Sequence, residues 1–255
     1  MKTALSTACF FPLEPEKAFL KVSNLGFETA EVFLNTDYEV SSEYINELKA
    51  LSESEGVKIC AIHSPYGYAE PIIFFSPYIR RREESLAKYE RIFENISVFG
   101  PVIFNFHGAH LKNCPLELGI EYYIKLNEIA KKYEVIFCQE NVNKYLFSTP
   151  ENIKALKDAY PDVNFTLDIK QANRAGFSPY EILDAMGENT RHFHINDFNG
   201  LSDCLLPGAG DFPLEDFTKK LKLKGFNGNA VIEVYRKNFK TEEEVITSRK
   251  FVEKL

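Results

Sequence analysis

Short apolar, β-branched or aromatic runs alternate with longer helix-like stretches along the whole chain, and no Pro/Gly/Ser-rich linker divides them. Such runs, bounded by turn residues, are typical of buried strands. The expected strands cover residues 3–9, 27–35, 57–63, 101–107, 135–140, 165–168, 191–196 and 229–235. The intervening stretches predict helices near 15–24, 43–55, 80–98, 116–133, 150–159, 213–223 and 241–254, with a further helix opening at 178–181.

Eight strands in strict alternation with eight helices predict an α/β fold, and 255 residues suit one large domain covering 1–255. A closed (β/α)8 barrel needs about 250 residues, or roughly 30 per unit. A doubly wound open sheet would tolerate the same alternation. The barrel is favoured because candidate site residues stand at six of the eight strand ends, which only a closed barrel brings together easily.

The four last strands each end in a residue that can bind a divalent cation, and these residues are spaced 28, 26 and 39 positions apart: Glu140, Asp168, His194 and Glu233. Because barrel strand ends converge on one face, we expect the four side chains to meet around one point. Carboxylates directly after apolar runs cost several kcal/mol to bury without a partner, which a cation would supply. Oxygen and nitrogen ligands without thiolate suit Mn²⁺, Mg²⁺, Co²⁺, Fe²⁺ or Zn²⁺.

Further histidines extend this pattern. His63 ends the third expected strand and His107 the fourth, so both are candidates for a second metal or for substrate binding. His192 shares a strand face with His194 by the period of two, and we expect it in a lower layer behind the ligands. Asp197 is a candidate to orient His194 through the free ring nitrogen, as is usual for metal-bound imidazoles.

Composition narrows the class of protein. A formal net charge of −7 gives no global basic field, which argues against a nucleic-acid or anionic-membrane partner. No window approaches 18 uninterrupted apolar residues, so no transmembrane helix is expected. Five widely spaced cysteines without CxxC pairs argue against a disulfide framework and predict that the protein is located in the reducing cytoplasm. The aromatic stretch 72–75 is a candidate lid or a contact with a second subunit, which leaves a homo-oligomer open.

At these strand ends the chain resembles the xylose-isomerase-like TIM-barrel superfamily, which includes sugar isomerases and epimerases, dehydratases and endonuclease IV. The shared motifs span nearly the whole chain: Glu140-Asn141, Asp168, His194-x-x-Asp197, LPGAGDF at 206–212 and Glu233 within GNAVIEVY. The resemblance implies that Glu140 and Glu233 bind one divalent metal and also shuttle protons. A sugar or sugar phosphate would be isomerised or epimerised through an enediolate.

One departure concerns the substrate. Where the family commonly has Asp-x-x-His, this chain has Asp168-Ile169-Lys170-Gln171, so an amide replaces the expected imidazole. We therefore expect Lys170, Gln171 and Asn141 among the substrate-binding residues, with Lys170 able to bind a phosphate or carboxylate. Further basic candidates for a phosphate are Arg174, Arg236 and Lys237.

Two alternatives stay open. One is a metal-dependent dehydratase or lyase acting on a polyol or keto acid. The other is a phosphoesterase like endonuclease IV, in which residues at the positions of His63 and His107 hold one zinc and the residue at Glu140 bridges to a second. The third metal position of that family is broken here, because Gln171 replaces one histidine and Asp203-Cys204-Leu205 lacks another.

Overall fold

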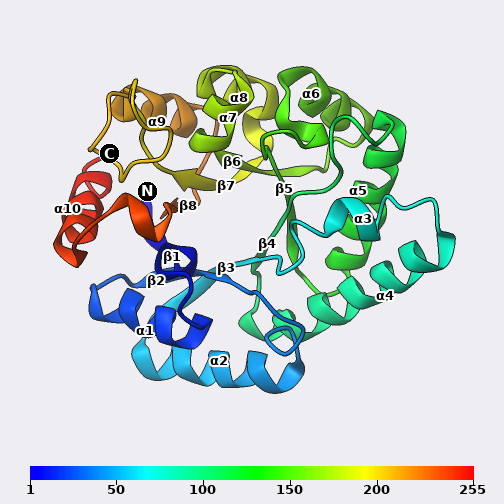
Figure 1. The fold of residues 1–255 in the computed structure, drawn as a ribbon, viewed down its shortest axis with the longest axis horizontal. Coiled ribbons are helices and arrows are strands. Elements are labelled where there is room, and N and C mark those ends of the chain that lie inside the picture. The colour runs from blue at the N-terminus through cyan, green and yellow to red at the C-terminus, as the bar shows by residue number, and fades with distance from the viewer.

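Eight parallel strands hydrogen-bond in sequence order and close on themselves, and the helices form a ring around them (Figure 1). The structure is a computed structural model and describes residues 1–255. The strands are β1 (Lys2–Ser6), β2 (Thr29–Phe33), β3 (Lys58–His63), β4 (Ile103–Phe106), β5 (Ile136–Glu140), β6 (Asn164–Asp168), β7 (Thr190–Ile195) and β8 (Asn229–Ile232). The predicted (β/α)8 barrel is therefore confirmed, with β1 shorter than expected because a 3-10 helix begins at Thr7.

All eight expected helices are present, and two short ones were not predicted. The α-helices are α1 (Pro15–Asn24), α2 (Ser42–Glu55), α3 (Glu70–Ile73), α4 (Ile79–Ile96), α5 (Leu116–Lys131), α6 (Pro150–Ala159), α7 (Ile169–Ala175), α8 (Pro179–Met186), α9 (Leu214–Leu223) and α10 (Glu242–Val252). The additions are α3 and α7, which lie in the connections after β3 and β6. No helix is long and apolar enough to cross a membrane.

Local sequence explains where α7 begins and ends. The Asp168 carboxylate accepts a hydrogen bond from the Gln171 amide and so caps the helix directly at the end of β6. Gly176 ends the helix in the left-handed conformation, with φ of 82°. The segment after β6 is therefore a helical turn anchored at the strand end, and this placement fixes the two residues that follow Asp168.

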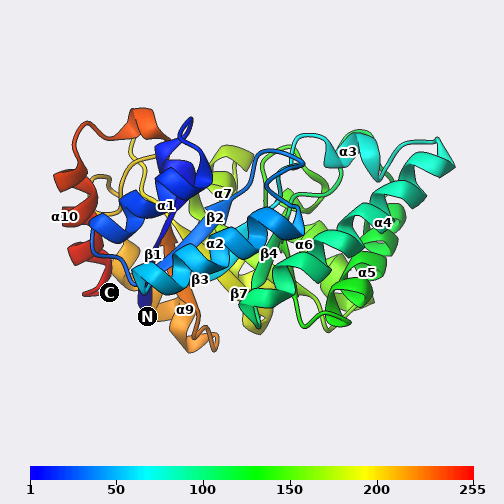
Figure 2. The same cartoon turned by 90° about the horizontal axis from the view of Figure 1, so that it is seen from below.

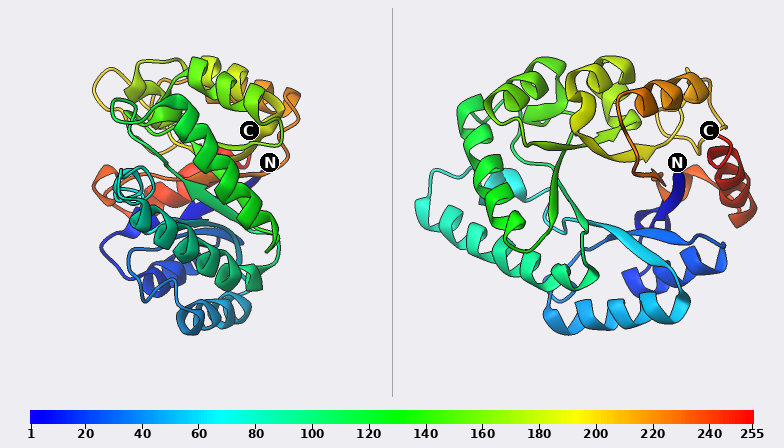
Figure 3. Two further views of the ribbon diagram at one scale, coloured as in Figure 1. Left: turned by 90° about the vertical axis from the view of Figure 1, so that its right-hand side faces the viewer. Right: turned by 180° about the vertical axis from the view of Figure 1, so that it is seen from behind.

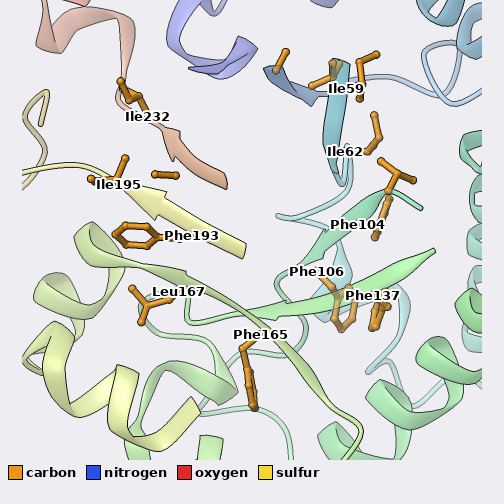
Figure 4. Close-up of a cluster of buried hydrophobic side chains, with 14 of the residues drawn as sticks. Ile59, Ile62, Phe104, Phe106, Phe137, Phe165, Leu167, Phe193, Ile195 and Ile232 are labelled. Carbon is orange, nitrogen blue, oxygen red and sulfur yellow. The ribbon is translucent and has the colours of Figure 1, made fainter. Parts of the chain in front are cut away.

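Alternation along the strands separates an apolar outer surface from a polar interior. Successive strand side chains point to opposite faces. Phe104, Phe137, Phe165 and Phe193 are completely buried and point away from the barrel interior towards the helices (Figure 4). Burying each such ring stabilises the fold by roughly 1.5–3 kcal/mol.

The opposite faces of the same strands are polar and equally buried. They carry five fully buried side chains in the barrel interior, Glu31, Asn105, Thr166, His192 and His194. These groups are hydrogen-bonded to one another, which offsets their desolvation. The interior thus forms a polar base for the site above it.

The connections that follow the strands gather at one end of the barrel. Figure 2 shows α3 and α7 at the same rim, and Figure 3 shows the ring of helices from its edge and from behind. The two chain ends lie near each other, where β8 pairs with β1 and closes the barrel. Residues that stand at the carboxyl ends of strands are therefore neighbours in space, as the barrel prediction requires.

Candidate metal centre and active site

Four of the predicted ligands converge at the carboxyl ends of adjacent strands, and we call Glu140, Asp168, His194 and Glu233 the carboxylate cluster. One ligand atom from each lies within 4.8 Å of the others. The Nδ1 atom of His194 is 3.5 Å from Glu140 Oε1, 3.7 Å from Asp168 Oδ2 and 3.6 Å from Glu233 Oε2. All four residues are buried. The arrangement surrounds a common point with three oxygens and one nitrogen.

The electrostatics of the cluster favour a bound cation. Burial disfavours the charged form of Glu140, but the nearby imidazoles of His107, His194 and His63 outweigh it and hold the pKa of this carboxyl well below its usual range. Burial also opposes ionisation of Asp168, yet Lys170 and His194 lower the pKa of that carboxyl. Buried Glu140 Oε2 and His194 Nδ1 have no hydrogen-bond partner. Charged oxygens and a free ring nitrogen directed at one point fit a divalent metal.

A second group, the imidazole cluster, consists of His63, His107 and Glu140. The Nε2 atoms of the two histidines are 3.2 Å apart, and they lie 3.4 Å and 3.2 Å from Glu140 Oε2. Ligand atoms around a tetrahedral ion with bonds of about 2.0–2.1 Å are about 3.3 Å apart, so this triangle has the dimensions of a metal site. Glu140 directs Oε1 to the carboxylate cluster and Oε2 to the imidazole cluster, and it can therefore bridge two ions.

Helix α3 supports the imidazole cluster from outside. The buried Glu70 carboxylate accepts hydrogen bonds from the backbone amides of His107 and Gly108, both at 2.8 Å, and from the Tyr89 hydroxyl at 2.7 Å. Tyr89 also contacts the Ser64 hydroxyl at 2.8 Å, directly after His63. One carboxylate thus ties the loop after β3 to the loop after β4, and so fixes the two histidines relative to each other.

Glu31 on β2 is a buried residue that our sequence analysis missed. Its Oε2 atom lies 2.8 Å from His192 Nε2 and 3.1 Å from His194 Nε2, and it accepts a 2.7 Å hydrogen bond from Asn105. This contact leaves the Nδ1 atom of His194 facing the three carboxylates. An acidic residue in the middle of an otherwise apolar strand, TAEVF, was the available signal.

The structure corrects the role expected for Asp197. Its carboxylate does not contact His194 but accepts hydrogen bonds from the backbone amides of Gly208, Gly210 and Phe212, at 3.0–3.1 Å. Asp197 therefore holds the 206–212 loop in place. Glu31 makes the contact with His194 Nε2 that we had assigned to Asp197, because that nitrogen points down into the barrel and away from the loops. His192 lies in the lower layer, beside Glu31.

The three predicted substrate-binding residues differ in position. Lys170 and Gln171 line the cavity above the cluster, whereas Asn141 does not. The Asn141 side chain is completely buried and makes two hydrogen bonds to the Asp168 backbone, at 2.7 Å and 3.0 Å. Asn141 therefore fixes the end of β6 and lies outside the cavity lining. Gln171 accepts a hydrogen bond from the Asn143 amide while facing the cavity.

A cavity of about 410 Å³ opens above both clusters. Its floor includes His63, His107, Glu140 and Glu233, and one wall is apolar. The wall comes from the segment between β1 and the start of α1, the end of β2 and the loop after β3: Phe11, Leu13, Pro15, Phe33, Pro65 and Tyr68. Lys170 is the sole basic side chain among the lining residues apart from the histidines. The cavity thus combines acid/base groups with an apolar face.

Comparisons of the chain with known proteins agree on one family. A model of the xylose isomerase-like TIM-barrel family matches residues 19–255. D-psicose 3-epimerase of Ruminiclostridium cellulolyticum is 24% identical over 228 residues, covering 84% of this chain and 76% of the relative. Fructoselysine 3-epimerase of Escherichia coli is 22% identical over 249 residues, 92% of this chain and 90% of the relative. The solved IOLI protein with a zinc atom superimposes with a TM-score of 0.77 at 18% identity, over 99% of this chain and 96% of the other.

Proposed function

Because the chain belongs to the xylose isomerase-like TIM-barrel family, we propose that it is a divalent-metal-dependent epimerase or isomerase of a neutral ketose or ketose derivative. The observation that carries the proposal is that Glu140 and Glu233 belong to the candidate ligand set and also line the cavity. Relatives named as D-psicose and fructoselysine 3-epimerases support a sugar substrate. A solved structural neighbour described with a zinc atom supports a bound metal.

In the proposed mechanism the two glutamates transfer the proton. One carboxylate removes the proton from the carbon next to the ketose carbonyl, and the other delivers a proton to the opposite face or the neighbouring carbon. A metal held by the carboxylate cluster would polarise the carbonyl and its neighbouring hydroxyl. Asp168 and His194 would hold this ion without exchanging protons with substrate. The Asp168 carboxylate caps α7, and His194 Nε2 contacts the Glu31 carboxylate.

A neutral substrate is favoured over a sugar phosphate because Lys170 is the one lysine or arginine that lines the cavity. Lys170 contacts Glu233 and Asp168. Arg174 contacts Asp203 through two nitrogens, and Arg236 donates to the Phe239 carbonyl. Lys237 does not line the cavity. A phosphate in the cavity would therefore meet one basic side chain, Lys170, beside the carboxylates of Glu140 and Glu233, which makes an uncharged hydroxyl the better fit.

The imidazole cluster favours one second candidate, a dinuclear phosphoesterase bridged by Glu140. The third metal position of endonuclease IV has no counterpart here. Gln171 accepts a backbone hydrogen bond, and Asp203 is paired with Arg174. Incision of abasic-site duplex DNA by the metal-loaded protein would favour this candidate. A dehydratase on a polyol or keto acid uses the same proton abstraction, and it would be recognised by loss of water from the substrate.

The experiment that tests the proposal follows solvent exchange. The Mn²⁺-loaded protein is incubated with ketoses in deuterated water, and NMR measures deuterium incorporation and formation of the epimer. We expect Glu140→Gln and Glu233→Gln to lower the exchange rate by about 10²–10⁴-fold, the usual contribution of a general acid or base. Glu39→Gln is the matched control, because Glu39 is buried yet lies outside both clusters. Exchange that survives both active-site changes would refute the assignment.

A further inference from the structure

The Lys170 side chain contacts two members of the carboxylate cluster. Its ammonium nitrogen lies 2.8 Å from Glu233 Oε2 and 3.3 Å from Asp168 Oδ2, and the residue is only 3% exposed. These two oxygens are the same atoms that face His194 Nδ1, at 3.6 Å and 3.7 Å. Lys170 therefore contacts the metal-facing oxygens of two of the four candidate ligands.

The local fold explains why the side chain points inward. Asp168 caps α7, which makes Lys170 the second residue of that helix and directs its side chain over the end of β6. The ammonium nitrogen also lies 5.3 Å from the centre of the Tyr235 ring, which closes the other side. A lysine two positions after a strand end would be solvated if the chain continued as a loop. Here the helical turn keeps it in the site.

The charges of the cluster change with this residue. Glu140, Asp168 and Glu233 carry three negative charges when ionised. The Lys170 ammonium offsets part of this charge, so it already supplies, at Glu233 and Asp168, positive charge that a divalent ion would bring to the same oxygens. An ion bound to the same two oxygens would stand within a few ångströms of the ammonium, where repulsion in a buried site is strong.

We infer that Lys170 and a divalent metal compete for Glu233 and Asp168. In the metal-free protein the ammonium pairs with the two carboxylates and stabilises the buried cluster. Metal binding weakens this pairing and moves the ammonium towards the cavity, so Lys170 sets a weaker and more reversible metal affinity. The inference rests on the proposed metal site but not on any catalysed reaction.

Two measurements on Lys170→Met test it, each with and without Mn²⁺ and without substrate. We expect titration calorimetry to show Mn²⁺ binding at least about tenfold tighter than in the wild type, because one nearby positive charge is gone. We also expect the melting temperature of the metal-free variant to fall by at least about 5 °C, since two buried carboxylates lose their partner, and saturating Mn²⁺ to restore most of it. Two variants serve as controls. Lys170→Arg keeps the positive charge, and Lys219→Met removes an exposed lysine elsewhere in the chain.

The outcomes separate this inference from the proposed function. Equal or weaker Mn²⁺ binding by Lys170→Met than by the wild type would overturn the inference alone. If neither protein binds Mn²⁺, the metal site fails and the inference with it. If Lys170→Met does not fold, the wild type carries the test through acetylation of Lys170, read by mass spectrometry. Greater acetylation with Mn²⁺ supports displacement of the ammonium, and equal or lower acetylation refutes it.

Discussion

The half of the barrel built from β5–β8 and the half built from β1–β4 contribute different chemistry to one cavity. The β5–β8 half supplies every member of the carboxylate cluster. The β1–β4 half supplies two histidines, Glu31 and the apolar wall of the cavity. Glu140 is the one residue shared by the carboxylate cluster and the imidazole cluster.

This difference suggests a division of labour. Carboxylates that change partners during proton transfer stand at strand ends, where they reach both an ion and the substrate. The residues of the β1–β4 half hold the ligands in place, as Glu31 does for His194, belong to the imidazole cluster, as His63 and His107 do, or present a surface that a substrate would pack against. Changes in the carboxylate cluster of the β5–β8 half should abolish the reaction, whereas changes in the β1–β4 half should alter its rate or affinity. Variants in each half test this distinction.

The largest expected effect concerns metal content. We expect Asp168→Asn to lower the affinity of the carboxylate cluster for Mn²⁺ by more than about 100-fold, because a charged ligand is lost while asparagine still caps α7. His63→Ala should leave this affinity within a few-fold of the wild type. Both are measured by mass spectrometry of bound metal after dialysis and by titration calorimetry.

The matched pair also tests the second metal position. Loss of one metal of two in His63→Ala would show that the imidazole cluster holds an ion of its own. Loss of all metal in His63→Ala would contradict the division between the halves, because it would make the two clusters one site. Circular dichroism of both variants controls for folding.

A smaller effect is expected from Glu31, which acts through His194. Replacing Glu31 with Gln removes the carboxylate that holds His194 Nε2, and we expect Mn²⁺ affinity to fall by about 10–100-fold, as is typical when a partner of a metal-bound histidine is lost. His192→Gln is the control, because His192 contacts the same carboxylate but lies outside the carboxylate cluster. Equal losses of affinity in the two variants would indicate a general effect on the barrel interior.

The same division explains how much could be predicted. The fold and the four members of the carboxylate cluster were accessible because a barrel brings strand ends together whatever the details of register. Glu31 was not, because the direction of a residue within a strand depends on register, and the pairing of β2 with β3 is interrupted by an irregularity at Ala30/Glu31. The pairing of Lys170 with Asp168 and Glu233 could not be predicted either, because Asp168 ends a strand and begins a helix at once, which a periodic pattern does not reveal.

The smallest expected effect lies at the mouth of the cavity. Phe11 lines the apolar wall while remaining 61% exposed, so Phe11→Ala should leave the free energy of unfolding within about 0.5 kcal/mol. Loss of its contact with the carbon skeleton of a ketose should raise KM by roughly 3–10-fold with little change in kcat, because a bound substrate and its transition state lose the same contact. Tyr78→Ala is the matched control, since Tyr78 is 58% exposed and does not line the cavity. A fall in kcat at constant KM would instead place Phe11 in the proton-transfer step and remove the distinction between a chemical half and a binding half.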